Sequence, residues 1–235
     1  MTAATRRGAV GAVVVAAGRG VRLGAERPKA LLEVAGRPLV VHAVERVLAA
    51  GIDHLVVVHT PGEHAAFAAA LRELPATLVE GGATRTASVR AGVAALPPAV
   101  DLVAVHDAAR AFTPPAVVAA TVAAVRDGAD DVLGAAPGLP VADTLKRVVD
   151  GEVVATVDRD ELVAIQTPQT FPRTVLAAAL DLGDAATDDL GLVERLRDTG
   201  AVTGRLVLVA GSPDALKVTY PEDVAAAERL AAEGR

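Results

Sequence analysis

The stretch VVVAAGRGVRLGAERPKALLEV, Val13–Val34, runs from an apolar segment directly into a basic, glycine-rich loop. The unbroken run of β-branched residues is typical of a strand that is buried on both faces of a parallel sheet. The loop that follows carries three glycines, three arginines and one lysine. Because ligands of open α/β sheets bind beyond the carboxyl ends of the strands, we expect this loop to hold an anionic ligand.

Working outward, short strand-like runs alternate with longer alanine-rich segments along the whole chain. Further strands are expected at 54–59, 76–80, 101–106, 130–136 and 205–210. Helices are expected at 38–51, 62–74, 84–96 and 114–128, with a final one from Pro221. This alternation predicts an α/β fold with a doubly wound, mostly parallel sheet, Rossmann-like in its arrangement. We expect one domain that spans residues 1–235.

One segment, Asp143–Arg159, breaks the alternation. Two strand-like runs meet there at Asp150-Gly151, a dipeptide that tolerates the positive φ angles of a tight turn. We therefore expect an antiparallel hairpin arm at about residues 140–160. Two interpretations stay open: the arm pairs with a second copy of the protein, or it lies as an edge hairpin on its own domain.

Bulk composition excludes several classes of function. The 235 residues carry a net charge of −6, which argues against nucleic-acid binding, and no segment reaches the ~20 apolar residues of a membrane helix. The chain has no cysteine, so it can form neither a disulfide framework nor a thiolate metal site. We expect a cytoplasmic protein whose anionic ligand is met by local positive charge.

The glycine loop matches neither common phosphate-binding fingerprint. Leu23 stands where a dinucleotide fingerprint needs its third glycine, and no G-K-[ST] ending is present. Pro28 also prevents a helix from starting at once. Glycine backbone N–H groups together with Arg and Lys side chains suit a triphosphate, and the alternative is a surface loop with solvated cations.

Three later loops also fall at strand ends. Arg85 and Ser88 lie one helical turn apart, in EGGATRTASVRAG at 80–92. Asp107 ends a buried strand, where a carboxylate can hold a hard cation, and Arg110 follows closely. Lys217 comes after the last strand and before the final helix. Singly each has a plain structural explanation, but together they converge on one edge of the sheet.

The motifs occur in an order that resembles a known family. They are AAGRGVRLGAERPK, GGATRTASVRAG, VHDAAR, DTLKRV, TVDRDEL, QTPQTF and LKVTYPED. This series is similar to the 2-C-methyl-D-erythritol 4-phosphate cytidylyltransferases of the non-mevalonate isoprenoid pathway, within the nucleotidyltransferase superfamily. The resemblance spans about the whole chain. It implies transfer of CMP from CTP to methylerythritol phosphate, with release of pyrophosphate, by a magnesium-dependent homodimer whose arm reaches into the partner's site.

The resemblance also implies a role for each site residue. Catalytic roles fall to Arg22, Lys29, Arg159 and Lys217. Ala16, Ala17 and Gly18 would line the nucleotide, and Gly82 and Ser88 would read the cytosine edge. Asp107 would hold Mg²⁺ or another divalent cation. The methylerythritol phosphate would be held by Thr144, Arg159, Thr167 and Lys217, with help from Arg110.

Other functions remain as alternatives at this stage. A ribitol 5-phosphate cytidylyltransferase shares most of these motifs but more often has A-G-G where this chain has Ala16-Ala17-Gly18. An enzyme coupling a sugar 1-phosphate to UTP or GTP fits the arm motifs poorly. A non-catalytic nucleotide-binding module would need affinity but not the charges that stabilise a transition state. Ala215, where the family commonly has asparagine, is a departure that could change how Lys217 is held.

Overall fold

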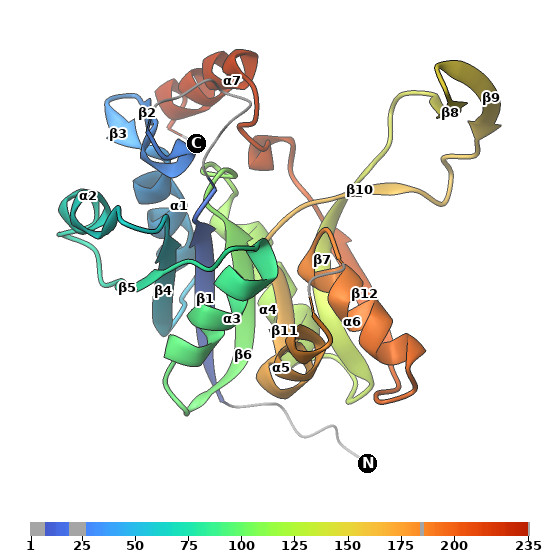
Figure 1. The fold of residues 1–235 in the computed structure, drawn as a ribbon, viewed down its shortest axis with the longest axis horizontal. Coiled ribbons are helices and arrows are strands. Elements are labelled where there is room, and N and C mark those ends of the chain that lie inside the picture. Colours follow the sequence, from blue (N-terminus) through green and yellow to red (C-terminus); the bar gives the residue numbers. More distant parts are fainter. Residues whose placement is uncertain (1–7, 19–26, 184–185, 235) are drawn as a thin grey trace.

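A computed structural model describes residues 8–18, 27–183 and 186–234 of the chain. Its centre is an eight-stranded sheet in the order β10-β7-β11-β6-β1-β4-β5, with β12 paired to β7 (Figure 1). Four strands run parallel side by side: β5 (Thr77–Glu80), β4 (His54–His59), β1 (Ala9–Ala16) and β6 (Val100–Asp107). The predicted mostly parallel α/β sheet is confirmed, and the strands expected from 54 and 205 match β4 and β12.

The other half of the sheet is mixed. β12 (Arg205–Ala210) runs parallel to β7 (Val132–Pro140), whereas β10 (Val163–Ile165) is antiparallel to it. β11 (Gln169–Pro172) lies antiparallel between β6 and β7. Neither β10 nor β11 is predicted from the sequence. Their position matters because β11 brings the segment around residue 167 beside the end of β6.

Helices cover both faces of the sheet, as a doubly wound fold requires. One face packs against α1 (Leu39–Ala49), α2 (His64–Ala70) and α4 (Pro115–Arg126). The other packs against α3 (Arg85–Ala95), α5 (Arg173–Asp181) and α6 (Asp189–Asp198). Side chains of β1 alternate accordingly: Val10, Ala12 and Val14 face the first set, and Val13 faces the second.

A third, smaller apolar cluster lies over the carboxyl ends of the central strands. It packs α7 (Pro221–Ala232) against the short strands β2 (Glu33–Val34) and β3 (Arg37–Pro38). The carboxylate of Glu228 accepts hydrogen bonds from the backbone N–H of Ala35, at 3.0 and 3.1 Å. The 3-10 turn η2 (Lys29–Leu31) directly precedes β2 in the chain, and the turn η3 (Pro213–Ala215) precedes α7.

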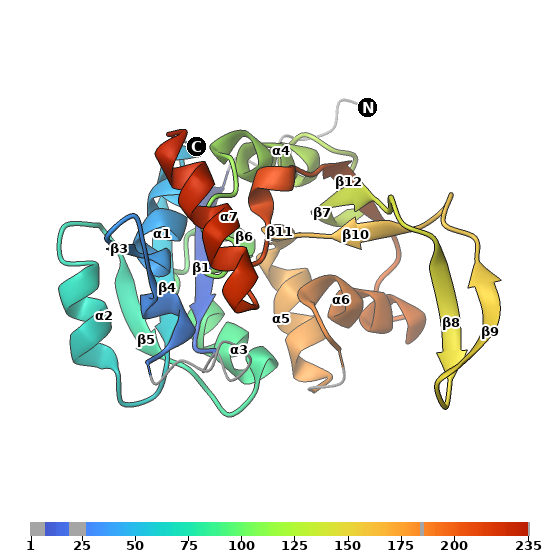
Figure 2. The ribbon, with the colours of Figure 1, turned by 90° about the horizontal axis from the view of Figure 1, so that it is seen from above.

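The predicted hairpin is confirmed as β8 (Leu145–Val149) and β9 (Glu152–Val157). Asp150 and Gly151 have φ angles of 49° and 84°, as a tight hairpin turn demands. The hairpin projects from the end of the molecule opposite β5 and α2 (Figure 2). Its valines are 52 to 65% exposed at four positions: Val148, Val149, Val153 and Val154. Pairing with a second copy stays a prediction, as does the assignment of residues 1–235 to one domain.

Within the described residues, no helix is both long and apolar enough to span a membrane.

Candidate active site

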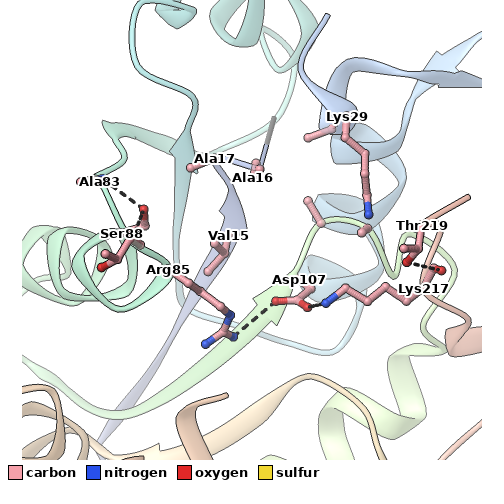
Figure 3. A pocket seen from close by; sticks show the side chains of 16 residues that line it. Val15, Ala16, Ala17, Lys29, Ala83, Arg85, Ser88, Asp107, Lys217 and Thr219 are labelled. Atoms are coloured by element: carbon pink, nitrogen blue, oxygen red, sulfur yellow. Dashed lines mark hydrogen bonds and ion pairs between the residues drawn. The ribbon is translucent and has the colours of Figure 1, made fainter. Parts of the chain in front are cut away.

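A cavity of about 450 Å³ lies at the carboxyl ends of β1 and β6 (Figure 3). Its wall takes residues from the end of β1, from η2, from the start of α3, from the end of β6 and from the segment before α7. This is the edge at which the sequence predicts that the candidate loops converge. The predicted residues that line the cavity are Ala16, Ala17, Gly18, Lys29, Gly82, Ser88, Asp107 and Lys217.

The start of α3 forms one wall with a close backbone approach. Thr84 caps the helix by accepting a hydrogen bond from the N–H of Ala87 at 3.0 Å. The N–H of Gly82 donates to Oγ of Ser88 at 3.1 Å, and that hydroxyl donates to the carbonyl of Thr84. A Cβ on Gly82 would lie 2.6 Å from Cβ of Ala87, so only glycine fits there. The wall therefore offers small residues and oriented polar atoms.

Asp107, the last residue of β6, lies between two cations. Nζ of Lys217 lies 2.6 Å from its Oδ2, and Nη2 of Arg85 lies 3.3 Å from its Oδ1. Burial alone would raise the pKa of Asp107, but Arg85 and Lys217 outweigh that effect and hold the pKa well below its usual range. Asp107 is therefore a carboxylate at any physiological pH.

Arg85 also contacts a second carboxylate. Its Nη2 lies 2.7 Å from Oδ2 of Asp189, which is fully buried at the start of α6. Burial lowers the pKa of Arg85, and the two carboxylates more than reverse this, so the net shift is upward. The guanidinium is thus a permanent positive charge in the cavity wall.

The basic loop after β1 is only partly described. Lys29 begins η2 and points into the cavity (Figure 3). Arg22 lies in 19–26, outside the described residues, so its predicted catalytic role has no structural observation to set beside it.

Thr167 and Arg110 are not among the cavity-lining residues, but each contacts the backbone of a segment that carries one. Oγ1 of Thr167 accepts a hydrogen bond from the backbone N–H of Asp107 at 3.1 Å. The guanidinium of Arg110 donates to the carbonyls of Ala215 at 2.7 Å and Ile165 at 3.2 Å. Ala215 itself is fully buried, so the segment that carries Lys217 is held through its backbone.

His106 lies beneath Asp107 and is fully buried. Burial lowers the pKa of His106 to about 4, so the imidazole is neutral at physiological pH. Its Nδ1 lies 3.0 Å from Oγ1 of Thr167, the same oxygen that accepts from the N–H of Asp107. The hydrogen bond between Thr167 and His106 therefore links the imidazole to the site.

Thr144 and Arg159 lie on the arm and are exposed. Arg159 donates a hydrogen bond to the carbonyl of Ala142 at the base of the arm. Neither residue lines the cavity of its own chain. These two predicted substrate ligands are therefore the ones that the fold does not bring to the other site residues.

Asp107 is the residue predicted to hold a metal ion. No cluster of three or more His, Cys, Asp or Glu side chains that could hold a metal occurs among the described residues. Magnesium is usually bound through one or two carboxylates together with substrate phosphates and water, so a single ionised carboxylate at a cavity wall fits that cation.

Comparison with known proteins identifies the family. The family model described as IspD, 2-C-methyl-D-erythritol 4-phosphate cytidylyltransferase, matches residues 10–233. The chain belongs to this family. A curated relative of the same name from Nocardia farcinica is 47% identical, and the match covers 98% of this chain and 97% of the relative.

Solved IspD structures agree with the fold. The enzyme from Thermus thermophilus is 35% identical with a TM-score of 0.72, covering 94% of this chain and 98% of that one. The 4-diphosphocytidyl-2C-methyl-D-erythritol synthase from Anaerococcus prevotii is 26% identical with a TM-score of 0.80, covering 97% and 99%.

Two residues of this IspD-family site carry more than sequence reasoning assigned to them. The sequence places Arg85 on the same helix face as Ser88 without indicating its role, and it does not indicate Asp189. Arg85 could have been found, because a cation one turn before Ser88 faces the same space. No local pattern marks Asp189, since its partner lies 104 residues away in the sequence.

Proposed function

We infer that this chain transfers CMP from CTP to 2-C-methyl-D-erythritol 4-phosphate in isoprenoid precursor synthesis. The observation that carries this conclusion is the IspD family match over residues 10–233. The products are 4-diphosphocytidyl-2-C-methyl-D-erythritol and pyrophosphate. A phosphate oxygen of the acceptor attacks the α-phosphorus of CTP, and the bond between that phosphorus and the oxygen bridging to the β-phosphorus breaks.

The reaction brings two anions together, so positioning and charge neutralisation carry the catalysis. Lys29 and Lys217 supply ammonium groups on the cavity wall, and Arg85 adds a guanidinium. We assign Lys29, together with Arg22, to the negative charge that develops on the reacting phosphates and the departing pyrophosphate. No side chain needs to form a covalent intermediate.

We assign the nucleotide to the wall made by β1 and the start of α3. Ala16, Ala17 and Gly18 have little or no side chain, so a ribose and a base can lie close to the backbone there. Gly82 and Ser88 offer a carbonyl oxygen and a hydroxyl oxygen near the same wall. The exocyclic amine on the cytosine edge can donate hydrogen bonds to such oxygens.

We assign a divalent cation, magnesium in the first instance, to Asp107. A divalent cation held there would neutralise negative charge on the phosphates. Lys217 shares the carboxylate with Arg85, so Asp107 stays ionised when Lys217 turns toward a phosphate.

We assign the methylerythritol phosphate to Lys217, Thr167 and Arg110 of one subunit and to Thr144 and Arg159 of the partner's arm. The exposed valines of the hairpin support a homodimer, because an isolated two-stranded hairpin is marginal in water without a partner surface. The reaction consumes CTP, a cytoplasmic nucleotide, and we place the enzyme in the cytoplasm.

Pyrophosphate release tests the assignment. Each of the four NTPs is paired with methylerythritol phosphate, ribitol 5-phosphate and a sugar 1-phosphate. Release should be fastest, by at least tenfold, with CTP and methylerythritol phosphate. Faster release with ribitol 5-phosphate would move the chain to the ribitol alternative, and no release from any pair, with CTP still bound, would support a nucleotide-binding module.

A further inference from the structure

We propose that Asp189 is a positioning residue for cytidylyl transfer: it holds Arg85 so that the guanidinium stays against Asp107 in the cavity wall. The proposal rests on the proposed function and names a residue that acts through another rather than on the substrate.

The contact geometry indicates that Asp189 holds the guanidinium of Arg85 in place. A single nitrogen, Nη2 of Arg85, lies 2.7 Å from Asp189 and 3.3 Å from Asp107. The shorter contact is therefore with the carboxylate that does not line the cavity. Asp189 is fully buried, while the side chain of Arg85 is 29% exposed. The buried carboxylate anchors one side of the guanidinium and leaves the rest facing the site.

Asp189 is a costly residue for a purely structural position. Its Oδ1 is buried and has no hydrogen-bond partner among residues 8–18, 27–183 and 186–234. Burial raises the pKa of Asp189, because water is excluded from the carboxyl group, and Arg85 offsets part of this. A buried carboxylate with one unsatisfied oxygen is less stable than a neutral residue of the same size. A residue that only fills space in the core needs no charge, whereas a residue that holds a guanidinium does. The charge of Asp189 therefore fits a role in holding Arg85.

The segment around Asp189 is held in place by Gln169 of β11. Nε2 of Gln169 donates to Asp188 at 2.8 Å, and its Oε1 accepts from the N–H of Leu190 at 2.8 Å. Thr167, two residues earlier in the same QTPQTF motif, holds the N–H of Asp107. One short segment thus positions both carboxylates that contact Arg85.

Asp107 is ion-paired with two cations that differ in how firmly they are held. Lys217 is 44% exposed and free to turn toward a phosphate, while Arg85 is tied to Asp189. Without the charge of Asp189, Asp107 would become the only carboxylate partner of Arg85 in the described part of the chain. The guanidinium would then be drawn onto the carboxylate that the cation needs. Loss of Asp189 should therefore appear as a weaker response to magnesium.

The test uses the full chain with CTP and methylerythritol phosphate over a magnesium titration. Asp189→Asn should lower kcat about tenfold and raise the magnesium concentration for half-maximal activity several-fold, as for other residues that orient a metal ligand. Thr121→Val is the matched control, because it removes a buried hydrogen bond to Thr170 that involves none of the site charges. It should lower Tm without changing the magnesium response.

A double variant separates positioning from folding. Arg85→Gln leaves Asp189 buried without its cation, so Tm should fall; adding Asp189→Asn should restore part of the Tm and cause no further loss of kcat. If the two losses of kcat add, or if Asp189→Asn lowers only Tm, the positioning role is wrong. Should the wild type release no pyrophosphate, the proposed function fails instead, and calorimetry of magnesium-dependent CTP binding to wild type and Asp189→Asn still decides the role of Asp189.

Discussion

Nζ of Lys217 lies 2.6 Å from Oδ2 of Asp107, so the proposed phosphate ligand and the proposed metal ligand are ion-paired with each other. The two residues are 110 positions apart in the sequence, and one ends β6 while the other precedes α7. The pair keeps two opposite charges at the cavity wall. From there Lys217 can turn toward a substrate phosphate, and Asp107 can hold a cation.

Lys217→Gln should raise the KM for methylerythritol phosphate about tenfold or more, because it removes the charge proposed to meet the acceptor phosphate. The KM for CTP should change less. Tm should shift by no more than about 4 °C, because the side chain of Lys217 is 44% exposed and Asp107 keeps its ion pair with Arg85, so the loss in free energy of unfolding is up to about 1 kcal/mol. Initial-rate kinetics with each substrate varied in turn measure both constants. A rise confined to the KM for CTP would reassign Lys217 to the nucleotide.

Asp107→Asn should raise the magnesium concentration needed for half-maximal activity, because an amide oxygen is a poorer ligand for a hard cation than a carboxylate. Asp131→Asn is the control, since Asp131 pairs with Arg205 on the surface away from the cavity. The measurement is a magnesium titration at saturating CTP. A lower Tm with an unchanged magnesium response would make Asp107 a structural carboxylate.

Lys29→Met should reduce kcat on the order of 10²-fold, as for removal of one preorganised charge, while CTP affinity changes much less. The reason is that the ammonium group matters most when the phosphates approach one another. Stopped-flow turnover and calorimetric CTP binding separate the two effects. Arg72→Met, an exposed cation beside Glu73, serves as the charge-matched control. Normal turnover at saturation with lost CTP binding would make Lys29 a binding residue only.

The parallel half of the sheet could be predicted because each strand there is a local apolar run. The run at 54–59 is buried from Leu55 to His59, and its pattern alone marks it as a strand. β11 could not be predicted in this way. Its four residues, Gln169–Pro172, include two polar side chains and a proline, and it becomes a strand only because β6 and β7 flank it. Pairing with strands that are distant in the sequence therefore determines that β11 is a strand.

The same distinction applies to the candidate site, where some residues could be predicted from the sequence and others could not. Asp107 and Lys217 were predictable because each follows a strand at the ligand-binding edge. The supporting contacts of Thr167 and Arg110 were not, because they join segments 60 and 105 residues apart. Sequence position indicates which residues reach the cavity, whereas the residues that hold them are found only from the packed structure.

Gln166→Leu should lower the free energy of unfolding by about 1–3 kcal/mol, because two polar groups lose their partner. Oε1 of Gln166 accepts from the N–H of Ser212 at 3.0 Å, and its Nε2 donates to the carbonyl of Ser212 at 2.8 Å. The corresponding fall in Tm is roughly 3–10 °C. Arg205→Gln, which removes an exposed ion pair from the neighbouring strand, should change Tm far less. Equal Tm values for the two variants would contradict the conclusion that the hydrogen bonds between Gln166 and Ser212 stabilise the fold.

The arm allows a test of whether Arg159 acts in the site of its own subunit (in cis) or in the site of the partner subunit (in trans). Arg159 lies on the projecting segment, contacts Ala142 and does not line the cavity of its own chain. If it acts in trans, every site combines Lys29 of one chain with Arg159 of the other. The single variants Lys29→Met and Arg159→Ala should then both be nearly inactive as homodimers, each for a different reason.

Dissociating the two variants and refolding them together in equal amounts should restore activity. Random pairing makes half of the dimers mixed, and each mixed dimer has one doubly altered site and one intact site, so about a quarter of all sites recover in a two-fold dimer. Subunit exchange is verified by mass-tagging one variant, and each variant refolded alone is the control. If Arg159 acts in cis, every site of a mixed dimer carries one altered residue, and activity stays at the level of the single variants despite verified exchange. That result would move Arg159 to its own subunit's site or to a purely structural contact at the base of the arm.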